Sequence, residues 1–198
     1  IIVVGIGLFL AFLTRINAPG WFNKSIQTAS LGYAIPGTVL GLGVLIVLSQ
    51  FDNLSSQLLN ISFLPILSGS VFALIFAYSL RFLSISFGTF EAELSRIPKT
   101  TDMAASTLGA RTLQLLKLVH LPMLRPALIT ASVLVFVDTM KELPATLILR
   151  PFNFETLATQ VYNYASVGQI EDAALPALII VGIGIIPVFV ASRKLHHL

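Results

Sequence analysis

Three ionisable side chains lie inside an otherwise apolar segment, and they are the first residues of this sequence that could do chemistry. Residues 126–149 are apolar except for Asp138, Lys141 and Glu142. A charge inside a membrane segment costs about 2.5–3.5 kcal/mol to insert, so such residues face protein or water and find partners. At spacings of three and four they share one helical face. Two interpretations stay open: an Asp138–Lys141 pair that fixes helix packing, or a carboxylate, Glu142 or Asp138, that lines a path.

A helix break is predicted directly after these charges. Pro144 follows Leu143, and proline disrupts a helix interior. Broken helices in membranes border cavities. Arg81, late in another apolar segment, is expected to extend its side chain to the cytoplasmic interface. Pairing of Arg81 with Asp138 or Glu142 is the alternative.

A polar stretch, residues 102–124, separates two of the apolar segments. Thr100 or Thr101 is expected to cap a helix, with Asp102 in its first turn. Gly109 is a poor interior residue for a helix, costing roughly 1 kcal/mol relative to alanine. The stretch therefore predicts a helix, a bend at Gly109 and a second helix, projecting from the membrane.

The histidines do not predict a metal site. His120 lies in the polar stretch, where we expect it at a partner interface or in solvent. His196 and His197 are adjacent in sequence at the chain end, and adjacent helical residues point apart, so a tail is favoured over a ligand pair. The absence of cysteine from the sequence excludes disulfides and thiolate metal sites.

Composition places these residues in a membrane protein. The chain has 198 residues, 56% hydrophobic and 11% charged, with a mean hydropathy of +0.90. Soluble domains carry about 25% charged residues, and a chain of this size cannot enclose so much apolar surface in water. A net charge of +3 gives little support for nucleic-acid binding. Because the sequence starts at Ile1 inside an apolar run, we expect a fragment with its start truncated.

Five apolar segments approach the ~20 residues that a spanning helix needs. They predict an all-α membrane protein with a single transmembrane domain over residues 1–198, and Pro36-Gly37 and Pro187 are expected to kink the second and fifth segments. The segments are residues 1–14, 31–49, 68–88, 126–149 and 173–192.

The basic residues predict the orientation. Residues 150–172 and 50–67 together carry one basic residue, Arg150, whereas the alternate connections and the C-terminus carry nine. Since basic residues favour the cytoplasmic side, residues 89–125 and the C-terminus are expected in the cytoplasm. The external connection 150–172 is expected to lie at the interface as an amphipathic segment near a gate. The nine are Arg15, Lys24, Arg96, Lys99, Arg111, Lys117, Arg125, Arg193 and Lys194.

The polar stretch resembles the EAA motif of ABC-importer permeases. That motif reads Glu-Ala-Ala, three residues, Gly, nine residues, Ile, one residue and Leu-Pro. Here Ala104-Ala105, Gly109, Val119 and Leu121-Pro122 have the same spacing. The resemblance implies a coupling helix that sits in a groove of an ATP-binding subunit. The residues that it assigns to docking are Asp102, Met103, Ala104, Ala105, Gly109, Ala110, Leu121 and Pro122.

One position departs from the motif. Met103 stands where the motif has glutamate, and Asp102 lies about 100° around the helix, so it cannot simply take over that contact. This puts one usual salt bridge to the ATPase in doubt.

Three further stretches together resemble the C-terminal half of ferric-iron ABC permeases: residues 136–166, which include KELPATLILRPFNFETLA, the run YAIPGTVLGLGVL at 33–45, and the basic tail SRKL at 192–195. The resemblance implies the transmembrane domain of a type I ABC importer in the bacterial cytoplasmic (inner) membrane, working by alternating access. Its partners would be a dimer of ATP-binding cassette subunits that carries ATP and Mg, a periplasmic or extracellular substrate-binding protein, a second permease half or identical copy, and membrane lipid. Asp138, Lys141, Glu142 and Pro144 are the path or gate candidates.

The chain itself is expected to be a transporter subunit without catalytic, cofactor or metal sites, because it lacks the G-x-x-x-x-G-K-[ST] phosphate loop. Alternatives are the same machine for thiamine, phosphonate, polyamine or another small solute. An ion-coupled secondary transporter, with Asp138, Lys141 and Glu142 as a proton relay, would work without an ATPase. An intramembrane enzyme is not favoured, since neither HExxH nor a paired-carboxylate arrangement is present.

Overall fold

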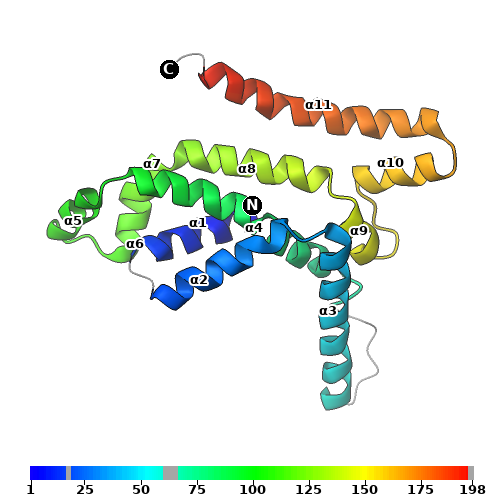
Figure 1. Cartoon of the computed structure of the whole chain (residues 1–198), viewed down its shortest axis with the longest axis horizontal. Coiled ribbons are helices and arrows are strands. Elements are labelled where there is room, and N and C mark those ends of the chain that lie inside the picture. The colour runs from blue at the N-terminus through cyan, green and yellow to red at the C-terminus, as the bar shows by residue number, and fades with distance from the viewer. Residues whose placement is uncertain (17–18, 60–66, 196–198) are drawn as a thin grey trace. The chain divides into compact units, whose positions relative to one another are not determined.

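The fold is built from helices. The computed structural model describes residues 1–16, 19–59 and 67–195, and no strand occurs within these ranges. Figure 1 shows the succession of helices from α1 to α11. The predicted all-α class is therefore confirmed.

The chain divides into two compact units, each made of two stretches of sequence. Unit 1 comprises Ile1–Tyr33 and Phe82–Val135, and unit 2 comprises Ala34–Arg81 and Phe136–Leu198. Helices α4 and α8 contribute residues to both units.

Unit 1 holds the N-terminal helices and the predicted docking stretch. The α1 helix buries Val4 and Phe12, and the Ser86 hydroxyl donates to the Val4 carbonyl at 3.4 Å. The core side of α4 is aromatic, with Phe82 and Phe90 among the largest fully buried side chains. The elements are α1 (Ile2–Arg15), α2 (Gly20–Ala29), a 3-10 turn (Ser30–Tyr33), α4 (Val71–Arg96) from Phe82 onward, α5 (Lys99–Thr107), α6 (Thr112–Gln114), a π-helix (Leu115–His120), α7 (Leu121–Met123) and α8 (Arg125–Met140) as far as Val135.

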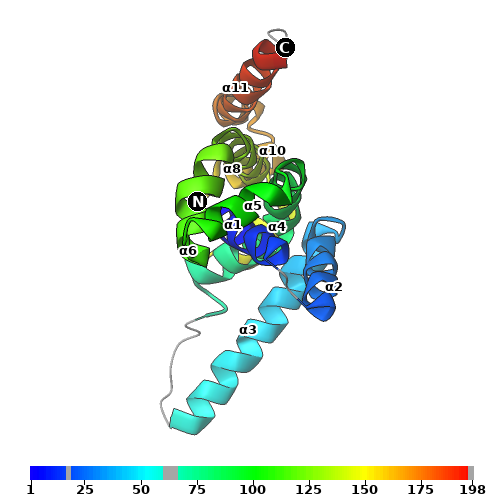
Figure 2. The same ribbon diagram turned by 90° about the vertical axis from the view of Figure 1, so that its left-hand side faces the viewer.

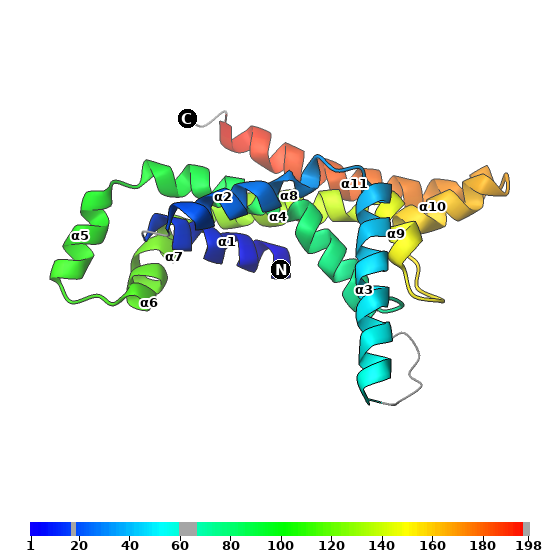
Figure 3. The same cartoon turned by 60° about the horizontal axis from the view of Figure 1, so that its bottom comes forward.

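Unit 2 is organised around α3, which is unbroken over its length (Figure 2). Its buried face packs with α4 and α9 in one apolar cluster that includes Leu40, Leu74 and Leu149. The α10 and α11 helices pack against each other, joined by a tight turn (Figure 3). The elements are α3 (Gly37–Leu59), the first part of α4, the end of α8, α9 (Pro144–Leu149), α10 (Leu157–Ser166) and α11 (Ile170–Leu195).

Two helices of the described chain are long and apolar enough to cross a membrane: Gly37–Leu58 and Val71–Arg96. A third candidate is the pair Thr112–Met123 and Arg125–Met140, which is bent by 76°. The α1 helix is apolar but shorter. Two or three candidate spans are thus found within the described residues, where the sequence predicted about five over the whole chain, and α11 covers the fifth predicted segment.

Several predicted boundaries are shifted. The α3 helix begins at Gly37, so Pro36-Gly37 forms its start rather than a kink, a position that proline tolerates because no helical N–H is lost. It continues to Leu59, through the first half of the expected 50–67 connection. Asp52 in its last turns accepts hydrogen bonds from the backbone N–H groups of Leu67 (3.0 Å) and Ser68 (2.9 Å).

Candidate functional site

The polar stretch folds as a helix, a bend and a second helical run, as predicted (Figure 3). The expected cap is wrong: α5 begins at Lys99 after Pro98, without a side-chain cap. Thr100 and Thr101 therefore lie inside the first turn. Asp102 also lies in that turn, as expected.

Gly109 makes the bend. Its φ is +83°, a conformation that costs L-residues with a Cβ but not glycine. Its N–H donates to the Ser106 carbonyl and the N–H of Ala110 donates to that of Ala105, both at 3.0 Å. These two bonds form a Schellman motif, which ends a helix at a left-handed residue. A Cβ at Gly109 would meet no atom within 4 Å, so the space beyond it is open.

The outer surface of α5 and its bend is mixed, with large apolar side chains among Lys99, Thr100, Ser106 and Thr107. Met103 is 64% exposed and Leu108 is 88% exposed, and Leu113 and Leu118 are exposed further along. None of the nine residues of α5 is buried. Exposed apolar side chains gathered on one element are typical of an interaction surface.

The other residues that the motif assigns to docking divide into two groups. Ala104, Gly109 and Pro122 are exposed, whereas Ala105, Ala110 and Leu121 are half-buried. Small and exposed side chains permit close approach of a partner.

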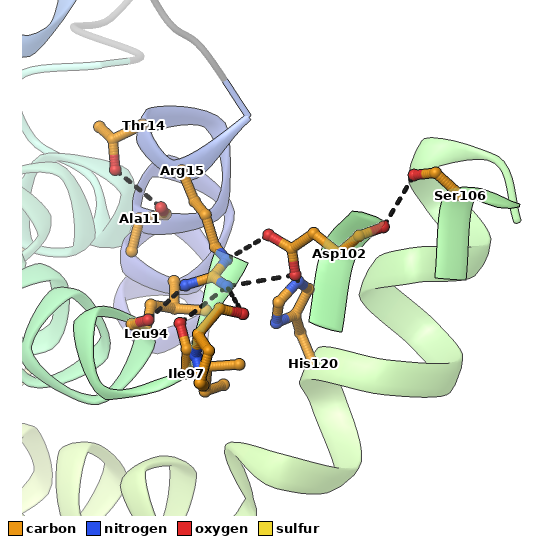
Figure 4. Close-up of polar contacts among 9 residues, drawn as sticks. Ala11, Thr14, Arg15, Leu94, Ile97, Asp102, Ser106 and His120 are labelled. Carbon is orange, nitrogen blue, oxygen red and sulfur yellow. Dashed lines mark hydrogen bonds and ion pairs between the residues drawn. The ribbon is translucent and has the colours of Figure 1, made fainter. Parts of the chain in front are cut away.

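Asp102 points into unit 1 rather than outward (Figure 4). Its Oδ2 accepts from Arg15 Nε at 2.7 Å and its Oδ1 from Arg15 Nη2 at 3.1 Å. This is a two-pronged contact between a guanidinium and a carboxylate, the stronger kind of ion pair. Arg15 is the last residue of α1, 87 positions away in sequence.

The same guanidinium holds the end of α4. Arg15 Nη1 donates to the Leu94 carbonyl, and Nη2 donates to the carbonyls of Ile97 (3.0 Å) and Pro98 (3.3 Å). The last carbonyls of a helix lack partners within the helix, and a cation there is favoured by the helix dipole. One side chain thus joins the ends of α1 and α4 to the start of α5.

His120 is buried, so its predicted position at an interface or in solvent is wrong. It is 0% exposed, and its ring packs edge-on against Phe12 with centroids 5.6 Å apart. Its Nε2 lies 3.1 Å from Asp102 Oδ1, in a geometry short of a hydrogen bond. Burial lowers the pKa of His120 below its ordinary value, although the Asp102 charge opposes that shift and the Arg15 charge adds to it.

The charges near the second candidate site fall into two separate pairs. The α8 helix ends at Met140 and α9 begins at Pro144, so the predicted break is confirmed. For this reason Glu142 lies outside the helix, and the expected common face with Asp138 and Lys141 is wrong. Lys141 Nζ lies 2.7 Å from Asp138 Oδ1, which is the pair that the sequence offered as one interpretation.

Glu142 pairs with Arg81 instead. Arg81 Nε lies 3.0 Å from Glu142 Oε2, and Arg81 Nη1 donates to the Ile35 carbonyl at 2.8 Å. Glu142 is only 6% exposed and also accepts from the Ala145 N–H at 3.3 Å. The expectation that Arg81 extends to the cytoplasmic interface is therefore wrong, and the alternative pairing is confirmed.

Gly37 lies close beside this pair. A Cβ at Gly37 would lie 2.7 Å from Glu142 Oε1 and 3.3 Å from the Pro144 Cβ. The first distance is shorter than real Cβ atoms tolerate, so a side chain there would displace the carboxylate. Three segments meet here: the start of α3, the middle of α4 and the α8–α9 break.

The predicted external connection is ordered over the described residues. Thr156 caps α10, and its hydroxyl accepts from the Thr159 N–H at 3.3 Å. Glu155 accepts from Arg150 at 3.2 Å and from Asn163 at 2.8 Å. Phe152, in the same connection, is 95% exposed.

His196 and His197 lie outside the described residues. Within the described part of the chain, no group of three or more His, Asp or Glu side chains is placed to hold a metal ion.

Sequence reasoning missed Arg15 as a functional candidate. It was counted only as one of nine basic residues that set orientation. Its position at the end of an apolar helix was the available signal, but nothing local indicates a partner 87 residues away.

Comparison with known families decides the kind of protein. Residues 3–197 match the family of binding-protein-dependent transport system inner membrane components. The chain belongs to this family. The match covers almost the whole sequence, so the two units are parts of one family domain, an all-α type I ABC permease.

The names of the curated relatives refer to two kinds of substrate. An Fe(3+)-transport system permease protein of Haemophilus influenzae is 28% identical over 81% of this chain. A ferric transport system permease protein of Actinobacillus pleuropneumoniae is 29% identical over 86% of it. A Salmonella paratyphi A protein, provisionally named a 2-aminoethylphosphonate transport system permease protein, is 28% identical over 76% of it.

The relatives are longer than this chain. The matched region makes up 29% of the Haemophilus protein, 25% of the Actinobacillus protein and 52% of the Salmonella protein. The chain therefore corresponds to one part of such permeases.

Proposed function

We propose that this chain is the membrane-spanning part of an ATP-driven importer, and that residues 102–122 dock an ATP-binding subunit. The observation that carries the proposal is the α5–Gly109–α6 element: an exposed helix with no buried residue, ended by a glycine with open space around it. Its position in a family of binding-protein-dependent permeases supports the same assignment.

Docking would rest on small and apolar contacts rather than on a carboxylate. Asp102 is held inside unit 1 by Arg15, and Met103, at the position of the motif's glutamate, is exposed. Ala104 and Gly109 would allow the partner groove to approach the backbone closely. ATP and Mg would bind to the partner, not to this chain.

Ferric iron is the proposed substrate, delivered by an external binding protein. Relatives from Haemophilus influenzae and Actinobacillus pleuropneumoniae are named for Fe(3+) or ferric transport. The aminoethylphosphonate permease of Salmonella makes phosphonate the second candidate.

Transport would proceed by alternating access. Closure of the ATP-binding subunits would move residues 102–122, and the outer gate near residues 138–170 would open. Asp138 and Lys141 at the end of α8 are the candidates to line the path, and Lys141 remains well exposed beside its partner. Glu142 and Pro144 would hold the break in place. We place the C-terminus in the cytoplasm, together with residues 89–125.

The docking assignment is tested by Gly109→Trp in the full permease. Because a Cβ at Gly109 meets nothing within the chain, the added ring obstructs only a partner. We expect the ATP-binding subunit to be lost on co-purification and ATP-driven uptake to stop.

Backbone strain needs its own control. Gly168 has a similar φ of +80° and equally open surroundings, so Gly168→Trp introduces the same strain elsewhere and should retain the ATP-binding subunit. Gly109→Asn, a residue that tolerates this conformation, should also retain it. Normal co-purification and uptake with Gly109→Trp would contradict docking at this element.

The substrate is tested by uptake in cells that express the permease with its ATPase and binding protein. We expect labelled ferric iron to accumulate in an ATP-dependent manner, unaffected by excess aminoethylphosphonate. Accumulation of the phosphonate without that of iron would assign the second substrate.

A further inference from the structure

We propose that Arg15 is the positioning residue that transmits movement of the docked α5 helix to α1 and α4. The inference rests on the proposed docking of residues 102–122. It assigns to one side chain the connection between the docking element and two apolar helices.

Besides its short covalent connection to α4 and its packing against the π-helix, the α5 helix has few links that could transmit a force. None of its residues is buried, and its outer side chains Met103 and Leu108 face away from the chain. An element without buried apolar contacts can shift without moving its neighbours. Its connection to other helices through side-chain hydrogen bonds and ion pairs, among the described residues, is made by Asp102 to Arg15 and His120.

The geometry of Arg15 suits a rigid connection. Its guanidinium fork grips both carboxylate oxygens of Asp102 and, on its other edges, the carbonyls of Leu94, Ile97 and Pro98. Arg15 is 7% exposed and Asp102 is 21% exposed, so solvent screens their attraction only in part. The planar fork fixes direction as well as distance, which an ammonium group cannot do.

The helices on the other side of this connection are those that would have to move. The α4 helix is one of the two described helices that qualify as membrane spans, and α1 is a shorter apolar helix. Arg15 is covalently part of α1 and holds the last carbonyls of α4. A displacement of α5 therefore acts on both helix ends at one point.

His120 completes the pocket around Asp102. It is buried, with its ring edge-on to Phe12 of α1 and its Nε2 3.1 Å from Asp102 Oδ1. The π-helix that carries His120 precedes α7, so both arms of the docking element converge on this carboxylate.

The test compares Arg15→Lys, Arg15→Gln and Asp102→Asn in the full complex, purified with its ATP-binding subunits and reconstituted in vesicles. Three quantities are measured: retention of the ATP-binding subunit, ATP hydrolysis, and uptake per ATP hydrolysed. We expect retention and hydrolysis to persist in every variant. Uptake per ATP should fall about tenfold in Arg15→Gln and Asp102→Asn, the change expected for loss of a charge-assisted contact. Arg15→Lys should retain more uptake per ATP than Arg15→Gln.

The double variant Arg15→Gln/Asp102→Asn should be no worse than either single one, because both remove the same connection. Arg96→Ala is the matched control: Arg96 also lies at the end of α4, but its ion pair with Glu93 is exposed, and uptake per ATP should not change. Unchanged coupling in Arg15→Gln and Asp102→Asn would overturn the proposal.

The same experiment separates the two assignments. If the unaltered permease retains no ATP-binding subunit, the proposed function fails and this inference with it. If the subunit is retained and hydrolysis falls together with folded protein in all three variants, Arg15 has only a structural role and the inference alone is wrong.

Discussion

Each unit of this chain contains an ion pair between an arginine and a carboxylate, and the two pairs differ in what surrounds them. Arg15–Asp102 in unit 1 fixes α5, which has no buried residue. Arg81–Glu142 in unit 2 sits at a helix break beside Gly37, with the apolar cluster of α3, α4 and α9 in the same unit. The first pair joins a surface element to helix ends, whereas the second fixes segments that are already packed.

An arginine–carboxylate pair can therefore support different roles, according to the packing around it. The Arg81–Glu142 pair joins segments that are packed against one another, so we expect it to contribute to folding. A pair that holds an otherwise unanchored element contributes to the transmission of movement. Loss of the Arg81–Glu142 pair should reduce the amount of folded protein, and loss of the Arg15–Asp102 pair should reduce coupling.

The largest effect is expected from Glu142→Ala. It leaves Arg81 without its carboxylate in a mostly buried site, a change that costs about 3–5 kcal/mol for buried pairs. Thermal unfolding of the detergent-solubilised permease should show a strongly lowered Tm and little folded protein. The double variant Arg81→Met/Glu142→Leu, with no charge, should regain most of the loss. If Glu142→Ala is as stable as the unaltered protein and only uptake is lost, Glu142 would instead be assigned to the path.

A smaller loss is expected from Gly37→Ala. The new methyl group would lie 2.7 Å from Glu142 Oε1 and would force the pair apart, and such overpacking costs about 1–3 kcal/mol. Gly43→Ala is the control in the same helix, because a Cβ there meets nothing within 4 Å. The free energy of unfolding should fall in Gly37→Ala and rise in Gly43→Ala, since alanine is otherwise the better helix former. Equal stability would show that the close approach at Gly37 is not limiting.

A still smaller effect on stability is expected from Lys141→Met. Its ion pair with Asp138 is exposed on the lysine side, and exposed pairs contribute about 0–1 kcal/mol. Tm should change little. Uptake should fall if this pair lines the path, as proposed, and unchanged uptake would remove Lys141 from it.

The stability of the folded chain should depend on pH through His120. Because burial lowers the pKa of His120, the folded chain binds the proton more weakly than the unfolded chain. Below the ordinary histidine value of about 6.5 the unfolded state then binds more protons, so stability declines as pH falls. The decline should be smaller in His120→Gln, compared by thermal unfolding at pH 7.5 and pH 5.5. Equal slopes in both proteins would show that His120 does not titrate in this range.

The sequence predicted the elements better than their partners. Hydropathy located the apolar segments, Pro144 marked the break after α8, and Gly109 marked the end of α5. These are local signals, since proline lacks an N–H and glycine permits a positive φ.

The long-range contacts were not predictable in the same way. Asp102 and Arg15 are 87 residues apart, and Arg81 and Glu142 are 61 apart. Helical periodicity assigns a residue to a face but not to a partner, and the face shared by Asp138 and Glu142 was lost because α8 ends two residues before Glu142. The polar neighbours of His120 in the sequence led to the prediction that it is accessible. Its ring instead makes a buried contact with Phe12.

The central claim, that residues 102–122 dock an ATP-binding subunit, is tested most directly by cross-linking. The chain has no cysteine, so Leu108→Cys introduces a single thiol at the exposed bend. A short cross-linker should join Leu108→Cys to the ATP-binding subunit in intact membranes. Phe152→Cys, at an even more exposed position of the opposite connection, should give no such product. A cross-link to the ATP-binding subunit from Phe152→Cys but not from Leu108→Cys would contradict the account.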